Sequence, residues 1–294
     1  MLTIKNLSKT YADGTHALKN INLTLPSGMI GLLGPNSAGK STLLRTLACL
    51  QTPSSGEIQF GQTNSIKNPG ALRAQLGYLP QYFGVYPNMS CYALLTHMAV
   101  LKGLKNKKQI SEQIQQLLEL TNLTQFANKK VTDFSGGMRQ RFGIAQALLG
   151  DPKLVIMDEP TAGLDPAERD RLHDMLVSIS QDKLILLSTH IVEDIENLCH
   201  HVALINQGEI IESGPVPSLI AHLEQKLWLT HHKPTNGEVV LNKCYRYGQP
   251  HYRVFAEHAP NPQAQKLTPT LQDRYFLDLA QCQTPQQGEL RHAS

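Results

Sequence analysis

A phosphate-binding loop is encoded at residues 34–42, where the sequence reads GPNSAGKST. Gly34, Gly39, Lys40 and Ser41 match the pattern G-x-x-x-x-G-K-[ST], in which backbone N–H groups and a helix N-terminus offer partial positive charge to phosphates. We expect Lys40 to reach the β- and γ-phosphates and the Ser41 hydroxyl to bind Mg²⁺. The other residues of the predicted loop are Pro35, Asn36, Ser37, Ala38 and Thr42.

Two carboxylates follow a strongly apolar segment, KLVIMDEP, at residues 153–160. Asp158 ends this predicted strand, which would place its carboxylate beside the phosphate loop to hold the metal directly or through water. Glu159 comes next and can act as the general base for an attacking water. A phosphate loop followed by an acidic strand end indicates nucleotide hydrolysis; a strand end whose carboxylates have no chemical role is the alternative.

A second glycine-rich segment, FSGGMRQR, occupies residues 134–141 and opens a helical pattern. It is also suited to phosphate, yet the sequence shows no second nucleotide site to accompany it. The set of motifs over residues 1 to about 220 resembles the ATPase subunit of ATP-binding cassette (ABC) transporters. In that family two cassettes sandwich two ATP molecules head to tail, which implies that Ser135, Gly136 and Gly137 bind the γ-phosphate held by the partner subunit.

The resemblance implies roles for residues that have no special meaning when taken alone. Tyr11 matches the aromatic residue that stacks on adenine, and Gln81 matches the glutamine that senses Mg²⁺ and water. Asp165 matches the loop that links the two sites across the dimer, and His190 matches the histidine that contacts the γ-phosphate. The implied catalytic residues are Lys40, Gln81, Glu159 and His190, the implied metal ligands are Ser41, Gln81 and Asp158, and the implied cofactors are ATP and Mg²⁺.

Three positions depart from the usual family pattern. Ser37 stands where glycine is usual, and a left-handed φ at this position would cost about 1 kcal/mol. Met138 replaces the glutamine of the second glycine-rich segment, which removes a polar contact, and Phe134 replaces a leucine at an apolar position. None of these changes removes a catalytic group, so we expect activity to survive at a shifted rate.

The order of predicted elements indicates an α/β fold with a largely parallel sheet and an inserted helical segment. The resemblance implies that this is a P-loop ABC-type core with an inserted helical subdomain. Strand-like segments occur at 2–7, 21–25, 29–34, 153–160, 183–190 and 201–211. Apolar residues at helical spacing dominate the segment from 84 to about 150, which we expect to be the helical subdomain. The whole cassette is predicted to span residues 1–220.

Residues 221–294 are expected to form a small α+β accessory region with a frayed tail. Short strand-like segments lie at 227–230, 237–247 and 251–258, and TPTLQDRYFLDLA predicts a helix over 268–280 with Thr270 as its cap. His231 and His232 are adjacent, but no third ligand stands at a spacing typical of metal sites. We therefore expect a packed appendage that takes no part in hydrolysis.

The composition of the 294-residue chain narrows its class. A net charge of +3 gives no reason to expect a nucleic-acid partner. No stretch approaches the roughly eighteen consecutive apolar residues of a transmembrane helix, and the N-terminus lacks an apolar core of signal-peptide length. Five scattered cysteines without a C-x-x-C pair favour reduced thiols over zinc or disulfides. These features lead us to expect a cytosolic chain.

The resemblance implies an ATPase subunit that energises a separate integral-membrane permease. Its partners would be a second ATPase subunit, either an identical copy or a related cassette, and the permease, which would hold it on the cytoplasmic face of the membrane as a peripheral protein. The segments GYLPQYFGVYPNMSCYALLTHMAVLKGL and PTLQDRYFL are similar to exporter cassettes, from which Ala93 and Gln272 depart. No residue of this chain identifies the transported molecule, because its contacts would lie in the permease.

Two other functions are considered. A soluble ABC-type ATPase acting on ribosomes or nucleic acid is one, but such relatives typically carry two cassettes in one chain or a long coiled-coil insertion. A catalytically inactive regulatory cassette is the other, and it is disfavoured because Lys40, Asp158, Glu159 and His190 are all present.

Overall fold

The chain divides into two units. The computed structural model describes residues 1–231, 233–234 and 238–283, and contacts within the chain group Met1–Ser213 and Gly214–Ser294. The sequence places this boundary at about residue 220, whereas helix α8 (Val216–Ala221) already packs against helix α9 (Leu271–Gln283) of the second unit. The division therefore comes before α8, a few residues earlier than expected.

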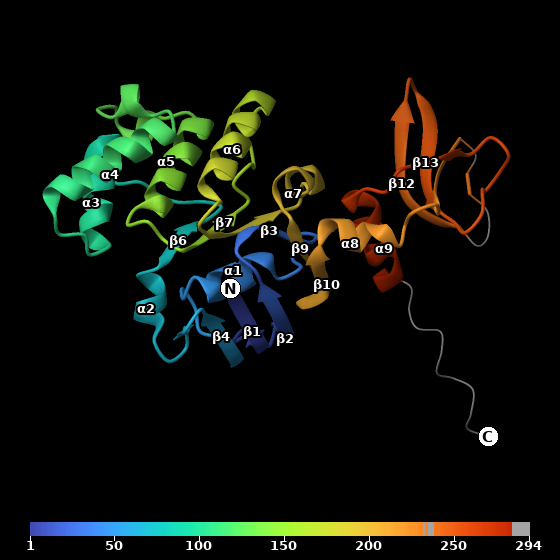
Figure 1. Ribbon diagram of the computed structural model, residues 1–294, viewed down its shortest axis with the longest axis horizontal. Helices are drawn as coiled ribbons and strands as arrows, with labels where there is room; N and C mark the ends of the chain where they lie inside the picture. The colour runs from blue at the N-terminus through green and yellow to red at the C-terminus, as the bar shows by residue number, and fades with distance from the viewer. Residues whose placement is uncertain (232, 235–237, 284–294) are drawn as a thin grey trace. The chain divides into compact units, whose positions relative to one another are not determined.

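The first unit contains a six-stranded sheet with the strand order β10–β9–β3–β8–β7–β6 (Figure 1). Its strands are β3 (Gly28–Leu33), β6 (Leu76–Leu79), β7 (Leu154–Asp158), β8 (Leu184–Thr189), β9 (His201–Asn206) and β10 (Glu209–Pro215). The pairs β9–β3, β3–β8, β8–β7 and β7–β6 are all parallel, which confirms the predicted parallel core. Strands β7 and β8 are buried along their whole length, as is typical of parallel strands covered on both faces.

The register of these parallel strands brings four strand ends to one edge of the sheet. Leu33 at the end of β3 pairs with Thr189 of β8, and Asp158 at the end of β7 pairs with Ser188. The last residue of β6, Leu79, pairs with β7 one position before its end. Because parallel strands share a direction, the segments that follow β3, β6, β7 and β8 all emerge at this edge.

A second sheet of the first unit is antiparallel and has the order β2–β1–β4–β5. Its strands are β1 (Leu2–Thr10), β2 (His16–Leu25), β4 (Ser55–Phe60) and β5 (Thr63–Asn64), and a short helix α2 (Pro69–Arg73) follows. Helix α1 (Lys40–Leu47) contacts both β2 and β7, and its buried leucines join residues of both sheets in one core. The sequence predicts strands in the regions of β1 and β2, but it does not predict that they form a separate antiparallel sheet.

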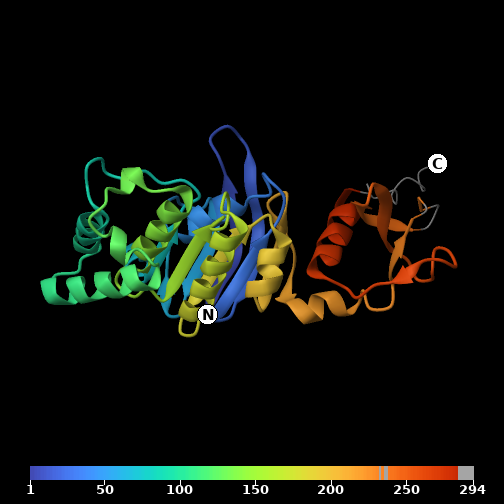
Figure 2. The same ribbon diagram turned by 90° about the horizontal axis from the view of Figure 1, so that it is seen from above.

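Three helices between β6 and β7 form the predicted helical block, seen at one end of the first unit in both views (Figures 1 and 2). They are α3 (Cys91–Leu101), α4 (Lys107–Leu120) and α5 (Gly136–Leu148), with two short 3₁₀ helices, η1 (Thr124–Phe126) and η2 (Val131–Asp133), before α5. The side chains of Ser90, Asn106 and Ser135 cap the three helices by accepting backbone N–H bonds. Helix α5 also packs against β6 and so connects the block to the large sheet.

Phe134 belongs to a row of aromatic side chains inside this block. Its ring centroid lies 6.4 Å from that of Phe142 and 6.5 Å from that of Phe126, and Phe83 lies 6.5 Å from Phe142. Phe134 is buried. The replacement of the usual leucine is therefore matched by aromatic neighbours, which gain from edge-to-face packing.

Helices α6 (Pro166–Ile179) and α7 (Val192–Leu198) follow β7 and β8, respectively, and contact each other. Helix α7 also lies against β3, the strand that leads into the phosphate loop. This close approach requires glycine at position 31, because a Cβ on Gly31 would lie 2.3 Å from Cδ1 of Ile195.

The second unit contains a sheet with the order β12–β13–β11–β14, covered by α9. Its strands are β11 (Leu227–Thr230), β12 (Val239–Arg246), β13 (Gln249–Phe255) and β14 (Gln265–Lys266). Leu223, Leu227, Leu241 and Leu277 form its core, as expected for a packed appendage. The frayed tail expected from the sequence falls largely on residues 284–294, which lie outside the described residues.

The PTLQD segment, residues 269–273, forms the beginning of α9 and its cap. The hydroxyl of Thr270 accepts the backbone N–H of Asp273 at 3.4 Å, which confirms the predicted cap, and the Asp273 carboxylate accepts two bonds from Arg253 at 2.7 and 2.6 Å. Gln272 is exposed, so its departure from the family pattern does not disturb this network. Among the described residues of both units, no helix is long and apolar enough to cross a membrane.

Lys102 is a half-buried cation at the end of α3. Its burial predicts how the free energy of unfolding depends on pH. Its ammonium group donates hydrogen bonds to the carbonyl oxygens of Ala147 and Leu149 near the end of α5, and burial lowers its pKa to about 8. Between this value and its ordinary pKa of 10.5, the unfolded chain binds more protons than the folded chain. The free energy of unfolding should therefore rise with pH across this window relative to Lys102→Met.

Urea unfolding of the two proteins at pH 7, 8, 9 and about 10 tests this prediction. The stability of the wild type relative to the variant is expected to increase from pH 8 upward. An exposed control, Lys105→Met, should show no such trend. If the free energies of unfolding of wild type and Lys102→Met differ by the same amount at all four pH values, the lowered pKa of Lys102 is contradicted.

Candidate active site

A cleft of about 750 Å³ opens where four of the six strands of the large sheet end, namely β3, β6, β7 and β8. This volume lies within the range of small-molecule sites. Twelve residues singled out from the sequence line it: Tyr11, Pro35, Asn36, Ser37, Ala38, Gly39, Lys40, Ser41, Thr42, Gln81, Glu159 and His190. The loop after β3, the segment after β6, and the residues that follow β7 and β8 thus meet in one place.

The phosphate loop is held in a conformation that glycine favours. Gly39 has φ 105° and directly precedes α1, and a Cβ there would lie 2.8 Å from the Ala17 carbonyl oxygen. Gly34 is also confined, since a Cβ would lie 2.2 Å from the Ile205 carbonyl oxygen. Ser37 has φ 65°, so the left-handed conformation expected at this departure is present, at a cost of about 1 kcal/mol.

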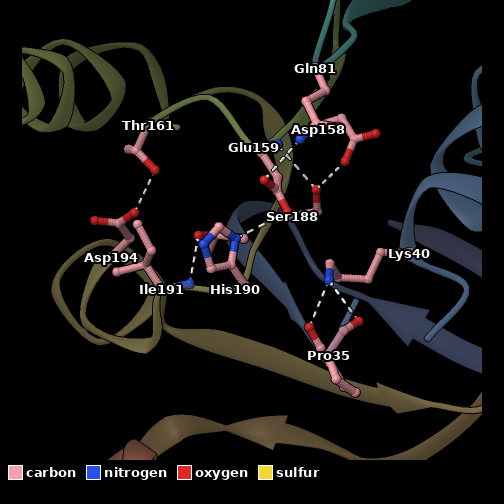
Figure 3. Close-up of polar contacts among 12 residues, drawn as sticks. Pro35, Lys40, Gln81, Asp158, Glu159, Thr161, Ser188, His190, Ile191 and Asp194 are labelled. Atoms are coloured by element: carbon pink, nitrogen blue, oxygen red, sulfur yellow. Dashed lines mark hydrogen bonds and ion pairs between the residues drawn. The ribbon is translucent and has the colours of Figure 1, made fainter. Parts of the chain in front are cut away.

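Lys40 lies at the first position of α1 and its side chain points back along the loop. It is only 6% exposed, and its ammonium nitrogen donates to the carbonyl oxygens of Gly34 at 2.6 Å and Pro35 at 3.0 Å (Figure 3). Burial lowers the pKa of Lys40, and the nearby carboxylates of Glu159 and Asp158 act in the opposite direction. The loop therefore fixes a partly desolvated cation where a phosphate could reach it.

Asp158 is a buried carboxylate held by a residue that the sequence analysis missed. The Ser188 hydroxyl donates to Oδ1 of Asp158 at 2.5 Å, and Asp158 is 2% exposed (Figure 3). The same hydroxyl accepts the backbone N–H of Glu159 at 3.2 Å. A signal for Ser188 was available: it is a polar residue in an otherwise apolar strand, two positions before His190.

The carboxylate of Glu159 connects two other implied catalytic residues. Gln81 donates from Nε2 to Oε2 of Glu159 at 3.1 Å, and Nδ1 of His190 lies 3.2 Å from Oε1 (Figure 3). Glu159 itself has φ 51°, an uncommon conformation for a residue that is not glycine, and its N–H is bonded to the Ser188 carbonyl at 3.0 Å. This strained turn after β7 aims the carboxylate into the cleft, where it can accept a proton from a water.

Tyr11 lies beside Thr42, the last residue of the phosphate loop. Its hydroxyl is 3.3 Å from Oγ1 of Thr42 and 3.3 Å from Oε1 of Gln51, and the Lys9 ammonium lies 5.5 Å from its ring centroid. These contacts hold the ring in the cleft wall beside the last residue of the loop. An aromatic ring placed there could stack on the base of a bound nucleotide.

Residues 18–162 match the family model described as ABC transporter. The Nod factor export ATP-binding protein I of Cupriavidus metallidurans is 41% identical over 223 residues, which cover 75% of this chain and 73% of that protein. The chain belongs to the ABC transporter family. A methionine import ATP-binding protein, MetN of Vibrio cholerae, is 34% identical over 77% of this chain and 69% of that protein. The relatives thus include both an exporter and an importer subunit, so the exporter type expected from the sequence is not confirmed.

A solved cassette has the same fold as this one. The dimeric post-hydrolysis structure of the ATP-binding cassette MJ0796, bound to ADP and Pi, matches 73% of this chain and 98% of that chain, with a TM-score of 0.67 and 26% identity. The present cassette is accordingly a P-loop ATPase that binds ATP, with the α/β fold predicted from the sequence.

The donor groups of the cassette fit a hard divalent cation. Ser41, Gln81 and Asp158 offer hydroxyl, amide and carboxylate oxygens near the strand ends. Among the described residues, no group of three or more His, Cys, Asp or Glu side chains could hold a metal ion alone. This pattern suits Mg²⁺, which usually takes one or two protein oxygens and completes its shell with phosphates and waters. Of the adjacent histidines His231 and His232, the second lies outside the described residues.

The second glycine-rich segment does not line the cleft of its own chain. Ser135 caps α5 by accepting the N–H of Met138 at 3.3 Å, and Asp165 caps α6 by accepting the N–H of Glu168 at 2.8 Å. The carboxylate of Glu168 lies against Gly137, where a Cβ would be 2.0 Å from Oε2. Six predicted site residues do not line the cleft: Ser135, Gly136, Gly137 and Asp165, and also Gly34 and Asp158, which are buried at the ends of β3 and β7.

Six residues of the cleft wall were not predicted from the sequence. They are Thr15, His16, Ala17, Lys19, Gln207 and Gly208. They come from the start of β2 and the turn between β9 and β10, which backbone bonds join: Lys19 donates to Gly208 at 2.8 Å, and Gly208 donates to Ala38 of the loop at 2.9 Å. No local pattern identifies them, because only the packing of two separate sheets brings them to the loop.

Proposed function

We propose that this cassette is the ATP-hydrolysing subunit of a transporter and energises a separate integral-membrane permease through a head-to-tail dimer that encloses two ATP molecules. The observation that carries this proposal is the separation of the two glycine-rich segments within one chain. Lys40, Glu159 and His190 line the cleft, whereas Ser135 and Gly137 do not. A second cassette, identical or related, supplies the missing segment, in line with the dimeric form of the MJ0796 relative.

In the proposed reaction each group of the cleft has one task. The loop N–H groups and Lys40 bind the phosphates, and Tyr11 stacks on adenine. Ser41, Asp158 and Gln81 hold Mg²⁺, which neutralises phosphate charge when bound. Glu159 takes a proton from the attacking water, while His190 orients the Glu159 carboxylate through Nδ1 and contacts the γ-phosphate.

The proposed direction of transport is export. The Nod factor export relative and the similarity of PTLQDRYFL to exporter cassettes support it, whereas the import relative argues the other way. The proposed permease contact lies just after Gln81, where Tyr82 is 84% exposed and Tyr86 is 49% exposed. Contact with a permease would hold the cassette on the cytoplasmic face of the membrane. The second unit is proposed to modulate assembly and to take no part in hydrolysis.

Mixing two inactive variants tests the composite site. In a head-to-tail dimer, a Lys40→Ala chain paired with a Ser135→Arg chain has one doubly defective site and one intact site. Each variant alone should be nearly inactive, and the mixture should recover up to about a quarter of wild-type ATPase activity, since half of randomly formed dimers carry one intact site of two. Activity no greater than the sum of the separate variants would contradict the shared site.

Fractionation of cells that co-express the permease tests the transporter role. We expect the chain in the membrane fraction, and we expect Tyr82→Ala combined with Tyr86→Ala to shift it to the supernatant. Tyr247→Ala, which changes a fully exposed tyrosine of the second unit, serves as the matched control and should leave the distribution unchanged. Sedimentation with ribosomes, or a wholly unbound wild-type pool, would favour the soluble ATPase acting on ribosomes or nucleic acid.

A further inference from the structure

A buried carboxylate outside the nucleotide cleft connects two helices and a loop of the ATPase site. Asp194 lies in α7 and is 1% exposed. Its Oδ2 accepts a hydrogen bond from the Thr161 hydroxyl at 2.6 Å, and Nε2 of His173 lies 3.1 Å from its Oδ1 (Figure 3 shows the bond to Thr161). Arg169 contributes a more distant positive charge, with Nε at 3.9 Å from Oδ1.

Asp194 and its partners belong to three segments that carry proposed catalytic and dimer residues. Thr161 stands two residues after Glu159, and Asp194 stands four residues after His190. His173 lies on α6, the helix that Asp165 caps. One carboxylate thus joins the segment of the general base, the segment of the γ-phosphate histidine and the helix that begins at the dimer loop.

Helix α6 extends this connection to the second glycine-rich segment. The Glu168 carboxylate, in the first turn of α6, lies directly against Gly137 in the first turn of α5. A Cβ on Gly137 would be 2.0 Å from Glu168 Oε2, so the carboxylate occupies the space beside this glycine. A displacement of α6 would carry Glu168 with it and change this contact with the start of α5.

The contact of Asp194 with Thr161 and His173 differs from ordinary core packing, because it consists of hydrogen bonds to a buried carboxylate. Helix α7 already has apolar anchors in Ile195 and Leu198, so a buried charge is not needed to attach it to the sheet. Burying a carboxylate is unfavourable unless directional hydrogen bonds compensate for the lost water. Such bonds have strict distances and angles, so they hold α6, α7 and the Thr161 segment in one relative arrangement and are lost when it changes.

We propose that Asp194 is a positioning residue that couples the His190 and Glu159 side of one nucleotide site to Asp165 and, through Glu168, to the segment that completes the partner's site. The inference rests on the proposed dimer. Asp194 does not line the cleft, so it acts on turnover and on communication between the two sites, and not on the affinity of a single chain for ATP.

Steady-state ATPase kinetics of Asp194→Asn test the inference. The variant keeps the shape of the side chain but loses its charge and weakens the bonds to Thr161 and His173. We expect kcat to fall about tenfold, the size of effect expected for one charged hydrogen bond, and KM for ATP to change less than about twofold. The Hill coefficient for ATP should fall toward one. Thr161→Val should shift kcat and the Hill coefficient in the same direction, and the exposed Asp174→Asn on α6 should change neither.

The outcomes separate this inference from its alternatives. If Asp194 merely stabilises the fold, Asp194→Asn lowers Tm and the active fraction, but the folded protein keeps the wild-type Hill coefficient, which would overturn the inference. A wild-type kcat in a folded Asp194→Asn protein would also overturn it. If the wild type itself hydrolyses ATP with a Hill coefficient of one and stays monomeric in ATP, the proposed dimer fails, and the coupling role of Asp194 fails with it.

Discussion

The register of four neighbouring parallel strands is the constraint on which the site depends. Leu33 opposite Thr189, and Asp158 opposite Ser188, place the ends of β3, β8 and β7 at the same level. Glu159 and His190 then lie within hydrogen-bonding reach of each other, and the phosphate loop lines the same cleft, without any long excursion of the chain. A slip of one strand would move its catalytic group by the rise of one residue, about 3.3 Å, which exceeds a hydrogen-bond length.

The site uses backbone conformations and burial that are unfavourable by themselves. Ser37 and Glu159 adopt left-handed φ angles, Lys40 is almost entirely buried, and Asp158 is held by a single neighbouring hydroxyl. Each of these features is tolerated because the fully buried strands β7 and β8 and the core around α1 supply a rigid support. The result is a set of charged groups with fixed orientations, which is the condition for electrostatic catalysis.

The sequence predicts the parts of the site that are contiguous along the chain and fails for those that are not. The loop at 34–42, the acidic end of β7 and the helical block are encoded locally, through glycine spacing, apolar runs and helical periodicity. Ser188, the β2 residues around His16 and the Gln207–Gly208 turn reach the cleft only through pairing and packing of distant segments. The antiparallel sheet was missed for the same reason. The proposed direction of transport could not be predicted from these residues, because contacts with the transported molecule would lie in the proposed permease.

The central claim is that ATP joins two copies of this chain, each supplying Ser135 to the other's site. The size of the Glu159→Gln protein, measured by light scattering with and without ATP, tests it most directly, because this variant keeps the shape of the site but lacks the general base and therefore retains ATP. The account predicts a monomer without ATP, a dimer with ATP, and no dimer when Ser135→Arg is added, although each chain still binds ATP. A Glu159→Gln protein that binds ATP yet stays monomeric at high concentration, even with its permease present, would contradict it.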